Sequence, residues 1–271
     1  MMKQATTFIG AGHMAEAIIA GLLSNGCSKE QIFSKNRSNM ERLAYMKQTY
    51  GICCDPPIEE MIARSDIIVL AMKPKDVSGA LETLKQYIRE DQLVISVLAG
   101  ISSADISEKL GNKAPIVRAM PNTSAAVGES ATSIAPGMYA TTEHVSIAEE
   151  MFSVIGTTTI VEEKDLHLVT GLAGSGPAYF YRIIESFEQA AVSLGLDKRA
   201  ARSLIRQVLI GAAEMLKDET VDPAELRRRV TSPGGTTAAG LEVLEANHLS
   251  EMLYDVLVQA MKRSEELGKS H

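Results

Sequence analysis

Up to about residue 162, short apolar runs alternate with stretches whose apolar positions repeat at helical spacing. The runs predict strands at Thr6–Ile9, Gln31–Ser34, Asp66–Ala71, Gln92–Val97, Ile116–Met120, Ala131–Ala135 and Thr157–Val161. The stretches that predict helices include Met14–Leu23, Asn39–Thr49, Val77–Ile88 and Thr142–Val154. The run Asp66–Ala71 is apolar on both faces, which is typical of a central parallel strand. We therefore predict an α/β domain over residues 1–162, built on a doubly wound parallel sheet.

From residue 163 to 271 the strand-like runs disappear, and the pattern predicts an all-helical domain. Helices are expected at Pro177–Leu194, Asp197–Lys217, Thr237–Ala246 and Ser250–Leu267, with another that begins at Asp222. The run Asp222-Pro-Ala-Glu225 has the N-cap, first-turn proline and third-position acid of a helix start. Wide apolar faces, for example over Leu204–Leu216, are hard to cover in so small a domain. We therefore expect at least a homodimer formed through this domain.

Composition excludes several classes of protein. The 271 residues suggest two domains, and 27 basic against 34 acidic residues give a net charge of −7, which argues against nucleic acid as a partner. The sequence holds no run of 18 apolar residues, which excludes a membrane span, and the acidic balance also argues against an anionic membrane as a partner. Three cysteines and five scattered histidines form neither a disulfide framework nor a metal-ligand spacing. The expectation is a cytoplasmic protein with no metal site.

A glycine-rich turn joins the first predicted strand to the first predicted helix. Gly10-x-Gly12-x-x-Ala15 has the spacing of the dinucleotide-binding turn, in which the first glycine permits the bend and the second admits a diphosphate. The helix start directs free N–H groups at the phosphates. The alternative is a tight turn with no ligand. The strand–turn–helix context favours a Rossmann-type cofactor domain, with His13 flanking the cofactor rather than acting as an acid or base.

The end of the second strand indicates which cofactor binds. NAD sites usually have an acidic residue there, which accepts a hydrogen bond from the ribose 2′-hydroxyl. This chain has Ser34-Lys-Asn-Arg-Ser38 instead, with no carboxylate. The Arg37, Lys35 and Ser38 side chains suit a 2′-phosphate, although Ser38 or Asn36 could simply cap the next helix. We predict NADP(H), with NADH as a weaker substitute.

Further loops follow the next three strands. Lys73-Pro74 and Val97-Leu-Ala-Gly100 come at the carboxyl ends of strands, where open α/β sheets bind ligands. Lys73 is interpreted as shaping the loop or contacting the cofactor, with a role as catalytic acid as the alternative. The segment Met120-Pro-Asn-Thr123 is expected to line the nicotinamide pocket; it could also be an ordinary turn.

The helical domain contains a second glycine-rich constellation. Gly174-Ser-Gly-Pro177 and Ser232-Pro-Gly-Gly-Thr-Thr237 both precede helices. Three hydroxyls and a helix start in the second segment suit a small carboxylate better than a polyphosphate. The adjacent Arg227-Arg-Arg229 could clamp a ligand, or could stabilise the carbonyl end of its own helix.

Several of these segments together resemble the pyrroline-5-carboxylate reductase family. They are Ile9-Gly-Ala-Gly-His-Met-Ala15, Ala71-Met-Lys-Pro74, Ala99-Gly100, Met120-Pro-Asn122, Gly174-Ser-Gly-Pro-Ala178 and Val230-Thr-Ser-Pro-Gly-Gly-Thr-Thr-Ala-Ala-Gly-Leu241. The resemblance implies a Rossmann-type NADP(H) domain, followed by a helical dimerisation domain that interlocks with a second subunit, and further assembly into a ring of dimers. The chain departs from the family at Ile58, where an asparagine often lies near the adenosine.

The loops and the resemblance together give the expected site. The cofactor-binding residues are Ile9, Gly10, Ala11, Gly12, His13, Met14, Asn36, Arg37, Ser38, Ala71, Met72, Lys73, Pro74, Val97, Ala99, Gly100 and Asn122. The substrate-binding residues are Ser232, Gly234, Gly235, Thr236 and Thr237. The implied reaction is hydride addition to the cyclic imine 1-pyrroline-5-carboxylate, which yields L-proline. Thr237 is the expected catalytic residue, with its hydroxyl on the ring nitrogen.

Two alternatives remain at this point. One is an NADP-dependent reductase that acts on a related cyclic imine or on a hydroxyacid; the hydroxyacid enzyme would need a lysine in the helical domain, and no motif surrounds Lys164, Lys198 or Lys217. The other is a nucleotide-sensing protein that binds the cofactor without turnover, against which the glycine and threonine loops of both domains argue.

Overall fold

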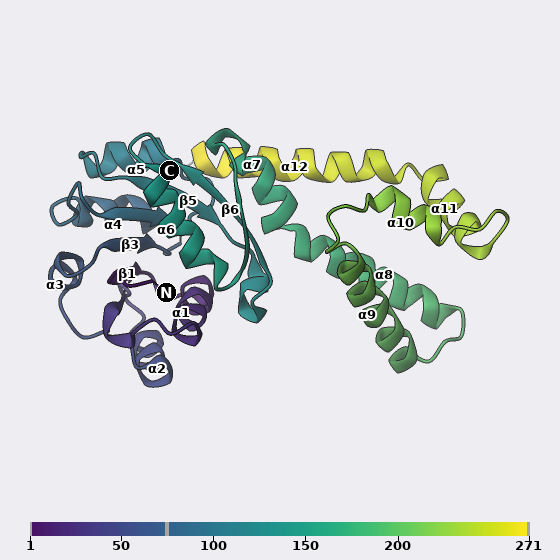
Figure 1. The fold of residues 1–271 in the computed structure, drawn as a ribbon, viewed down its shortest axis with the longest axis horizontal. Coiled ribbons are helices and arrows are strands. Elements are labelled where there is room, and N and C mark those ends of the chain that lie inside the picture. Colours follow the sequence, from purple (N-terminus) through teal and green to yellow (C-terminus); the bar gives the residue numbers. More distant parts are fainter. Residues whose placement is uncertain (1, 74–75, 270–271) are drawn as a thin grey trace. The chain divides into compact units, whose positions relative to one another are not determined.

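The structure is a computed structural model that describes residues 2–73 and 76–269. Within these residues seven strands form one sheet, in the order β2-β1-β3-β4-β5-β6-β7 (Figure 1). The strands are β1 (Thr6–Ile9), β2 (Ile32–Lys35), β3 (Ile67–Leu70), β4 (Leu93–Ser96), β5 (Ile116–Met120), β6 (Ser130–Pro136) and β7 (Gly156–Ile160). Each strand lies within one or two residues of its predicted position.

The sheet is parallel from β2 to β5, which confirms the predicted doubly wound fold. The two edge strands differ from that expectation: β6 runs antiparallel to β5, and β7 is parallel to β6. The cause is the short connection between β5 and β6, which contains only the 3-10 helix Thr123–Val127. A parallel neighbour would need a crossover of about a dozen residues or more, so this connection returns the chain in the opposite direction.

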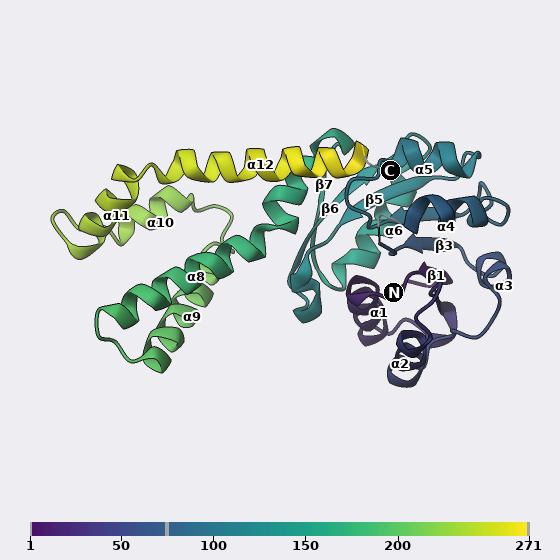
Figure 2. The same ribbon diagram turned by 180° about the vertical axis from the view of Figure 1, so that it is seen from behind.

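Helices cover both faces of the sheet (Figures 1 and 2). One face packs against α1 (His13–Ser24), α2 (Met40–Tyr50) and α6 (Thr142–Ser153), and the other against α3 (Ile58–Ala63), α4 (Val77–Leu84) and α5 (Ser103–Leu110). Alternation along β3 sends Ile67 and Val69 into the first core and Ile68 and Leu70 into the second. All four are at most 1% exposed, which explains why this strand is apolar on both faces.

The chain divides into two compact units, Met1–Pro177 with Val258–His271 and Ala178–Leu257. We call them the sheet unit and the helical unit. This division differs from the boundary expected between residues 162 and 163, because the chain stays attached to the sheet after β7. Leu166, in α7 (Leu166–Val169), is buried with residues of β5 and β6. The neighbouring His167 Nδ1 lies 3.0 Å from Ser264 Oγ, so the end of the chain also returns to the sheet unit.

The helical unit is built from the helices expected after residue 177. They are α8 (Gly176–Ser193), α9 (Lys198–Met215), α10 (Pro223–Arg229), α11 (Thr236–Ala246) and α12 (Leu249–Lys269), of which α8 begins and α12 ends in the sheet unit. Asp197 and Asp222 cap α9 and α10 by accepting backbone N–H groups. Among residues 178–257, all of which the structure describes, only Ala201 is buried. The helical unit therefore has no buried core of its own.

Candidate active site

The glycine turn lies at the carboxyl ends of β1, β2 and β3. Gly10 has a φ of +118°, and a Cβ there would lie 2.6 Å from the carbonyl carbon of Ala71 and 2.8 Å from Met72 N. Glycine is therefore required where the turn passes the loop after β3. At Gly12, the N-cap of α1, a Cβ would meet nothing within 4 Å. That open space beside a helix start fits a diphosphate, so the residues present suit the expected dinucleotide.

A polar cluster from α2 holds the same turn in place. Arg42 Nε donates to Ala11 O at 2.7 Å, and the guanidinium also pairs with Glu16 of α1. Tyr45 and Tyr50 donate to Glu16 Oε1 at 3.0 and 2.9 Å. Burial alone would raise the pKa of Glu16, but these hydrogen bonds hold it below its ordinary value. Burial and the Glu16 carboxylate raise the pKa of Tyr50 to about 12. No regular spacing in the sequence indicates this cluster.

The segment after β2 leaves cationic and hydroxyl groups accessible. Lys35 Nζ donates to Pro56 O at 3.1 Å, whereas Arg37 is exposed and meets Asp76 at 3.5 Å. Asn36 is half-buried and Ser38 is exposed. The cap of α2 is Asn39, which accepts Arg42 N–H, so the capping alternative for Ser38 and Asn36 is wrong. Arg37 and Ser38 remain available to a 2′-phosphate.

The loops after β3 and β4 reach the same edge of the sheet. Ala71, Met72, Val97 and Ala99 are half-buried, Lys73 is exposed, and Pro74 lies outside the described residues. Gly100 is buried with a φ of +81°, and a Cβ there would lie 3.0 Å from Gly268 N in α12. Gly100 thus faces the last turn of the chain's final helix, a neighbour that the sequence pattern did not indicate.

Asn122, expected to line the nicotinamide pocket, is 8% exposed and bonded within the protein. Its Oδ1 accepts Ser124 N–H at 3.0 Å, and its Nδ2 donates to Ala173 O at 3.1 Å. Ala173 belongs to the π-helical turn Thr170–Gly174, just before the Gly174-Ser-Gly-Pro177 segment. Asn122 therefore ties the loop after β5 to the start of the connection to the helical unit.

In the helical unit, the segment Ser232–Thr237 forms a tight turn into α11. Gly234 has a φ of +68°, and Gly235 is the N-cap, whose N–H donates to Ser232 O at 3.0 Å. Thr236 and Thr237 are the first two residues of α11. Within the described residues, the side chains of Ser232, Thr236 and Thr237 make no hydrogen bond. Thr237 is thus not a capping residue, and the three hydroxyls, all on exposed residues, lie in or directly before the first turn of α11.

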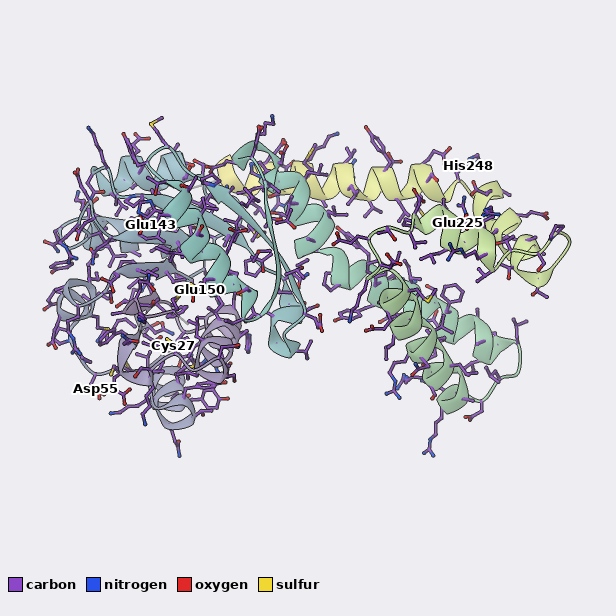
Figure 3. The ribbon with its side chains drawn as sticks, viewed as in Figure 1. Cys27, Asp55, Glu143, Glu150, Glu225 and His248 are labelled. Atoms are coloured by element: carbon purple, nitrogen blue, oxygen red, sulfur yellow. The ribbon has the colours of Figure 1, made fainter. Side chains whose placement is uncertain are left out.

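Two of the three arginines beside this turn form ion pairs within their own helix. Figure 3 labels Glu225 on α10. Its carboxylate accepts from Arg228 and Arg229, each at 2.8 Å, one turn along the same helix. Arg227 lines a cavity of about 480 Å³ together with Thr231 and Leu241. The described residues contain no cluster of three or more His, Cys, Asp or Glu side chains suited to a metal ion. In that part of the chain no helix is both long and apolar enough to span a bilayer.

A largely parallel sheet with an open glycine turn, followed by a helical unit, defines a nucleotide-dependent oxidoreductase of Rossmann type. Two family models match the chain: pyrroline-5-carboxylate reductase dimerisation over residues 163–267, and NADP oxidoreductase, coenzyme F420-dependent, over residues 6–100.

Relatives extend the match to nearly the whole chain. Pyrroline-5-carboxylate reductase 2 of Bacillus subtilis is 45% identical, over 96% of this chain and 94% of the relative. The structure of a pyrroline-5-carboxylate reductase from Coxiella burnetii has a TM-score of 0.93 and 35% identity, covering 98% and 99% of the two chains. That of Plasmodium falciparum pyrroline carboxylate reductase with NADP bound has a TM-score of 0.86 and 30% identity, covering 99% of both. The chain belongs to the pyrroline-5-carboxylate reductase family, which confirms the resemblance, the fold class and NADP(H) as cofactor.

Proposed function

We propose that this protein reduces 1-pyrroline-5-carboxylate to L-proline with NADPH, the last step of proline biosynthesis. The observation that carries the proposal is the set of three unpartnered hydroxyls, those of Ser232, Thr236 and Thr237, at the start of α11. A helix start with free N–H groups and free hydroxyls suits a small carboxylate, and a precursor of proline carries one.

The sheet unit binds the cofactor in this proposal. The residues of the glycine turn, from Ile9 to Met14, hold the diphosphate, and Asn36, Arg37 and Ser38 hold the 2′-phosphate. The backbone of Ala71, Met72 and Lys73 and that of Val97, Ala99 and Gly100 form the walls of the cofactor site. Asn122 acts through its bond to Ala173, which shapes that end of the site. The bound cofactor supplies a hydride.

The helical unit binds and orients the imine. The N–H groups of Gly234 and Gly235, together with the hydroxyls of Ser232 and Thr236, anchor the substrate carboxylate. The Thr237 hydroxyl bonds the ring nitrogen, which gains electron density as hydride adds to the carbon of the C=N bond. The substrate nitrogen carries its proton into the reaction, so the protonated imine plus hydride gives the neutral amine with atoms and charge balanced. The protein's work is orientation and exclusion of water, which requires no strong side-chain acid.

Assembly is part of the proposal. The apolar faces of the helical unit are covered by a second copy of the chain, which gives a homodimer, and dimers assemble into a ring. The protein acts in the cytoplasm, on a small molecule, without nucleic acid or membrane.

The test is to measure NADPH oxidation by the purified protein with 1-pyrroline-5-carboxylate, beside piperideine carboxylate and a β-hydroxyacid couple. We expect one proline formed for each NADPH consumed, with the pyrroline substrate strongly preferred. Preference for piperideine carboxylate would instead favour a reductase of the six-membered ring. NADPH binding without turnover of any substrate would support the nucleotide-sensing alternative and contradict the proposal.

A further inference from the structure

A charged side chain is buried in β5 beside the loop that follows β4. Arg118 is only 3% exposed, as buried as its apolar strand neighbours Val117 and Ala119. Its Nη1 donates to Glu163 Oε1 at 3.2 Å, and its Nη2 to Leu98 O at 3.3 Å, while its Nε is buried with no partner. Burial lowers the pKa of Arg118, and the neighbouring Glu163 carboxylate opposes that shift.

Glu163 is itself held in position. One carboxylate oxygen accepts Ser103 N–H at 2.6 Å, and the other accepts the Ser103 hydroxyl. Ser103 is the first residue of α5, directly after the loop that contains Leu98 and Gly100. The ion pair therefore fastens both ends of that loop: Arg118 holds its Leu98 carbonyl, and Glu163 holds its junction with α5.

The middle of the loop rests on α12. A Cβ on Gly268 would overlap the Gly100 carbonyl oxygen and would lie 3.3 Å from the Gly100 carbonyl carbon. The two glycines thus allow the backbones of α12 and the loop to touch. Three contacts, from β5, from the start of the connection after β7 and from the last turn of α12, fix a loop of a few residues.

Stability alone gives little reason for this arrangement. Replacing a buried ion pair by apolar side chains is often neutral or stabilising, because desolvation offsets much of the attraction. The unpartnered Arg118 Nε adds a further desolvation cost. The guanidinium has two terminal nitrogens, which bond Glu163 and the Leu98 carbonyl at the same time. An apolar side chain could bond neither.

We infer that Arg118 is a positioning residue for the cofactor site: with Glu163 and Gly268, it holds the Leu98–Gly100 backbone in the conformation that receives NADPH. The inference rests on the proposed function only in that this loop forms a wall of the cofactor site. It assigns Arg118 no contact with cofactor or substrate.

The test measures NADPH affinity of the full-length protein by fluorescence titration, together with kcat, KM and thermal stability, at a temperature where each variant is folded. Arg118→Met should weaken NADPH binding roughly tenfold to a hundredfold, because it releases the Leu98 carbonyl and leaves Glu163 without its cation. Arg118→Lys keeps the charge but not the fork, so it should recover only part of the affinity. The control, Arg89→Met, removes an exposed ion pair with Asp91 at the opposite end of β4 and should leave NADPH binding unchanged.

A glycine pair provides a second test if Arg118→Met does not fold. Gly268→Ala must push against Gly100 and should also weaken NADPH binding, whereas Gly79→Ala, in α4 with no atom near its Cβ, should not. Lower melting temperatures with unchanged NADPH affinity in both Arg118→Met and Gly268→Ala would overturn the inference. Because NADPH binding is measured directly, this outcome is distinct from failure of the wild type to turn over 1-pyrroline-5-carboxylate, which would contradict the proposed function.

Discussion

The buried apolar core lies in the sheet unit, whereas the helical unit leaves many large apolar side chains at its surface. Every residue of β3 is at most 1% exposed, while Val208 of α9 is 71% exposed and Phe187 of α8 is 59% exposed. Exposed apolar helices of this extent are typical of a surface that another chain covers. The comparison indicates that one unit is complete in a single chain and the other is completed by assembly, as the match to a dimerisation domain also suggests.

The largest expected effect breaks that assembly. In α9, Leu204 and Val208 lie one turn apart and are 59% and 71% exposed. The double substitution Leu204→Glu with Val208→Glu should place two charges in the interface and cost about 4 kcal/mol or more, roughly a thousandfold in dimer affinity. Sedimentation velocity should show a monomer, and NADPH oxidation by that monomer should be slow.

The matched control for the double variant is Met138→Glu. Met138 is 89% exposed but belongs to the sheet unit, so this variant should remain dimeric and active. If the α9 variant also sediments as the wild type does, the interface lies elsewhere.

A second substitution tests whether the helical unit acts on the substrate alone. Thr237→Ala should lower kcat about tenfold to a hundredfold, since a hydrogen bond near the reacting centre contributes ~1.5–3 kcal/mol. NADPH affinity should not change, because the residues proposed to bind the cofactor lie in the sheet unit. Thr220→Ala is the control, as its hydroxyl bonds Asp218 in the same unit. Normal turnover with a lowered melting temperature would mean that Thr237 has only a structural role.

The corresponding substitution in the sheet unit concerns the choice of cofactor. Arg37→Ala should weaken NADPH by about 1.5 kcal/mol, near the lower end for a charged hydrogen bond because the side chain is exposed. Affinity for NADH, which has no 2′-phosphate, should stay as it is. Steady-state kinetics with both cofactors check this, with Arg89→Ala as control. Equal losses for the two cofactors would contradict the assignment.

The smallest expected effect is a pH dependence within the sheet unit. The pKa of Glu16 is lowered in the folded protein from an ordinary value of 4.5. Its carboxylate therefore stabilises the fold above that value, and the contribution is lost as the pH falls through the lowered folded pKa. Glu16→Gln should reduce stability by about 1 kcal/mol at neutral pH, and the difference from wild type should close below pH 4.5.

Thermal melts across pH give this measurement. Glu82→Gln, which removes an exposed pair with Lys85, should change stability little at any pH. A stability difference for Glu16→Gln that persists at acid pH would show that shape, rather than charge, is what Glu16 contributes.

Much of the sheet unit could be predicted from the sequence, because apolar runs and glycine spacing are local signals. The run around Val69 indicated a buried strand, and Gly10 and Gly12 indicated the turn. The direction of β6 was missed because it depends on the length of one connection rather than on the strand's own pattern. The cap of α2 is Asn39 rather than Ser38. The sequence could not distinguish them, because serine and asparagine are both good N-cap residues.

The contacts that bind distant segments could not be predicted in this way. Arg118 and Glu163 are separated by 45 residues, and no periodicity relates them. Arg118 lies within a predicted strand and Asn122 within the predicted cofactor site, but the sequence pattern indicates the bonded partner of neither side chain. The packing of α12 on the sheet unit could not be predicted either, because the apolar face of a helix does not indicate which surface it contacts. Roles proposed for the catalytic and binding residues stay predictions until the variants above are measured.

The return of α12 has a consequence for how the chain is made. His167 and Ser264 are 97 residues apart, and the whole helical unit is synthesised between them. At about 5–20 residues per second, the ribosome needs on the order of ten seconds to cover that distance. During that time the early strands have formed, but the Gly100 loop lacks its support from Gly268. The loop at Gly100, which we propose forms a wall of the cofactor site, therefore gains this support only after α12 has been synthesised.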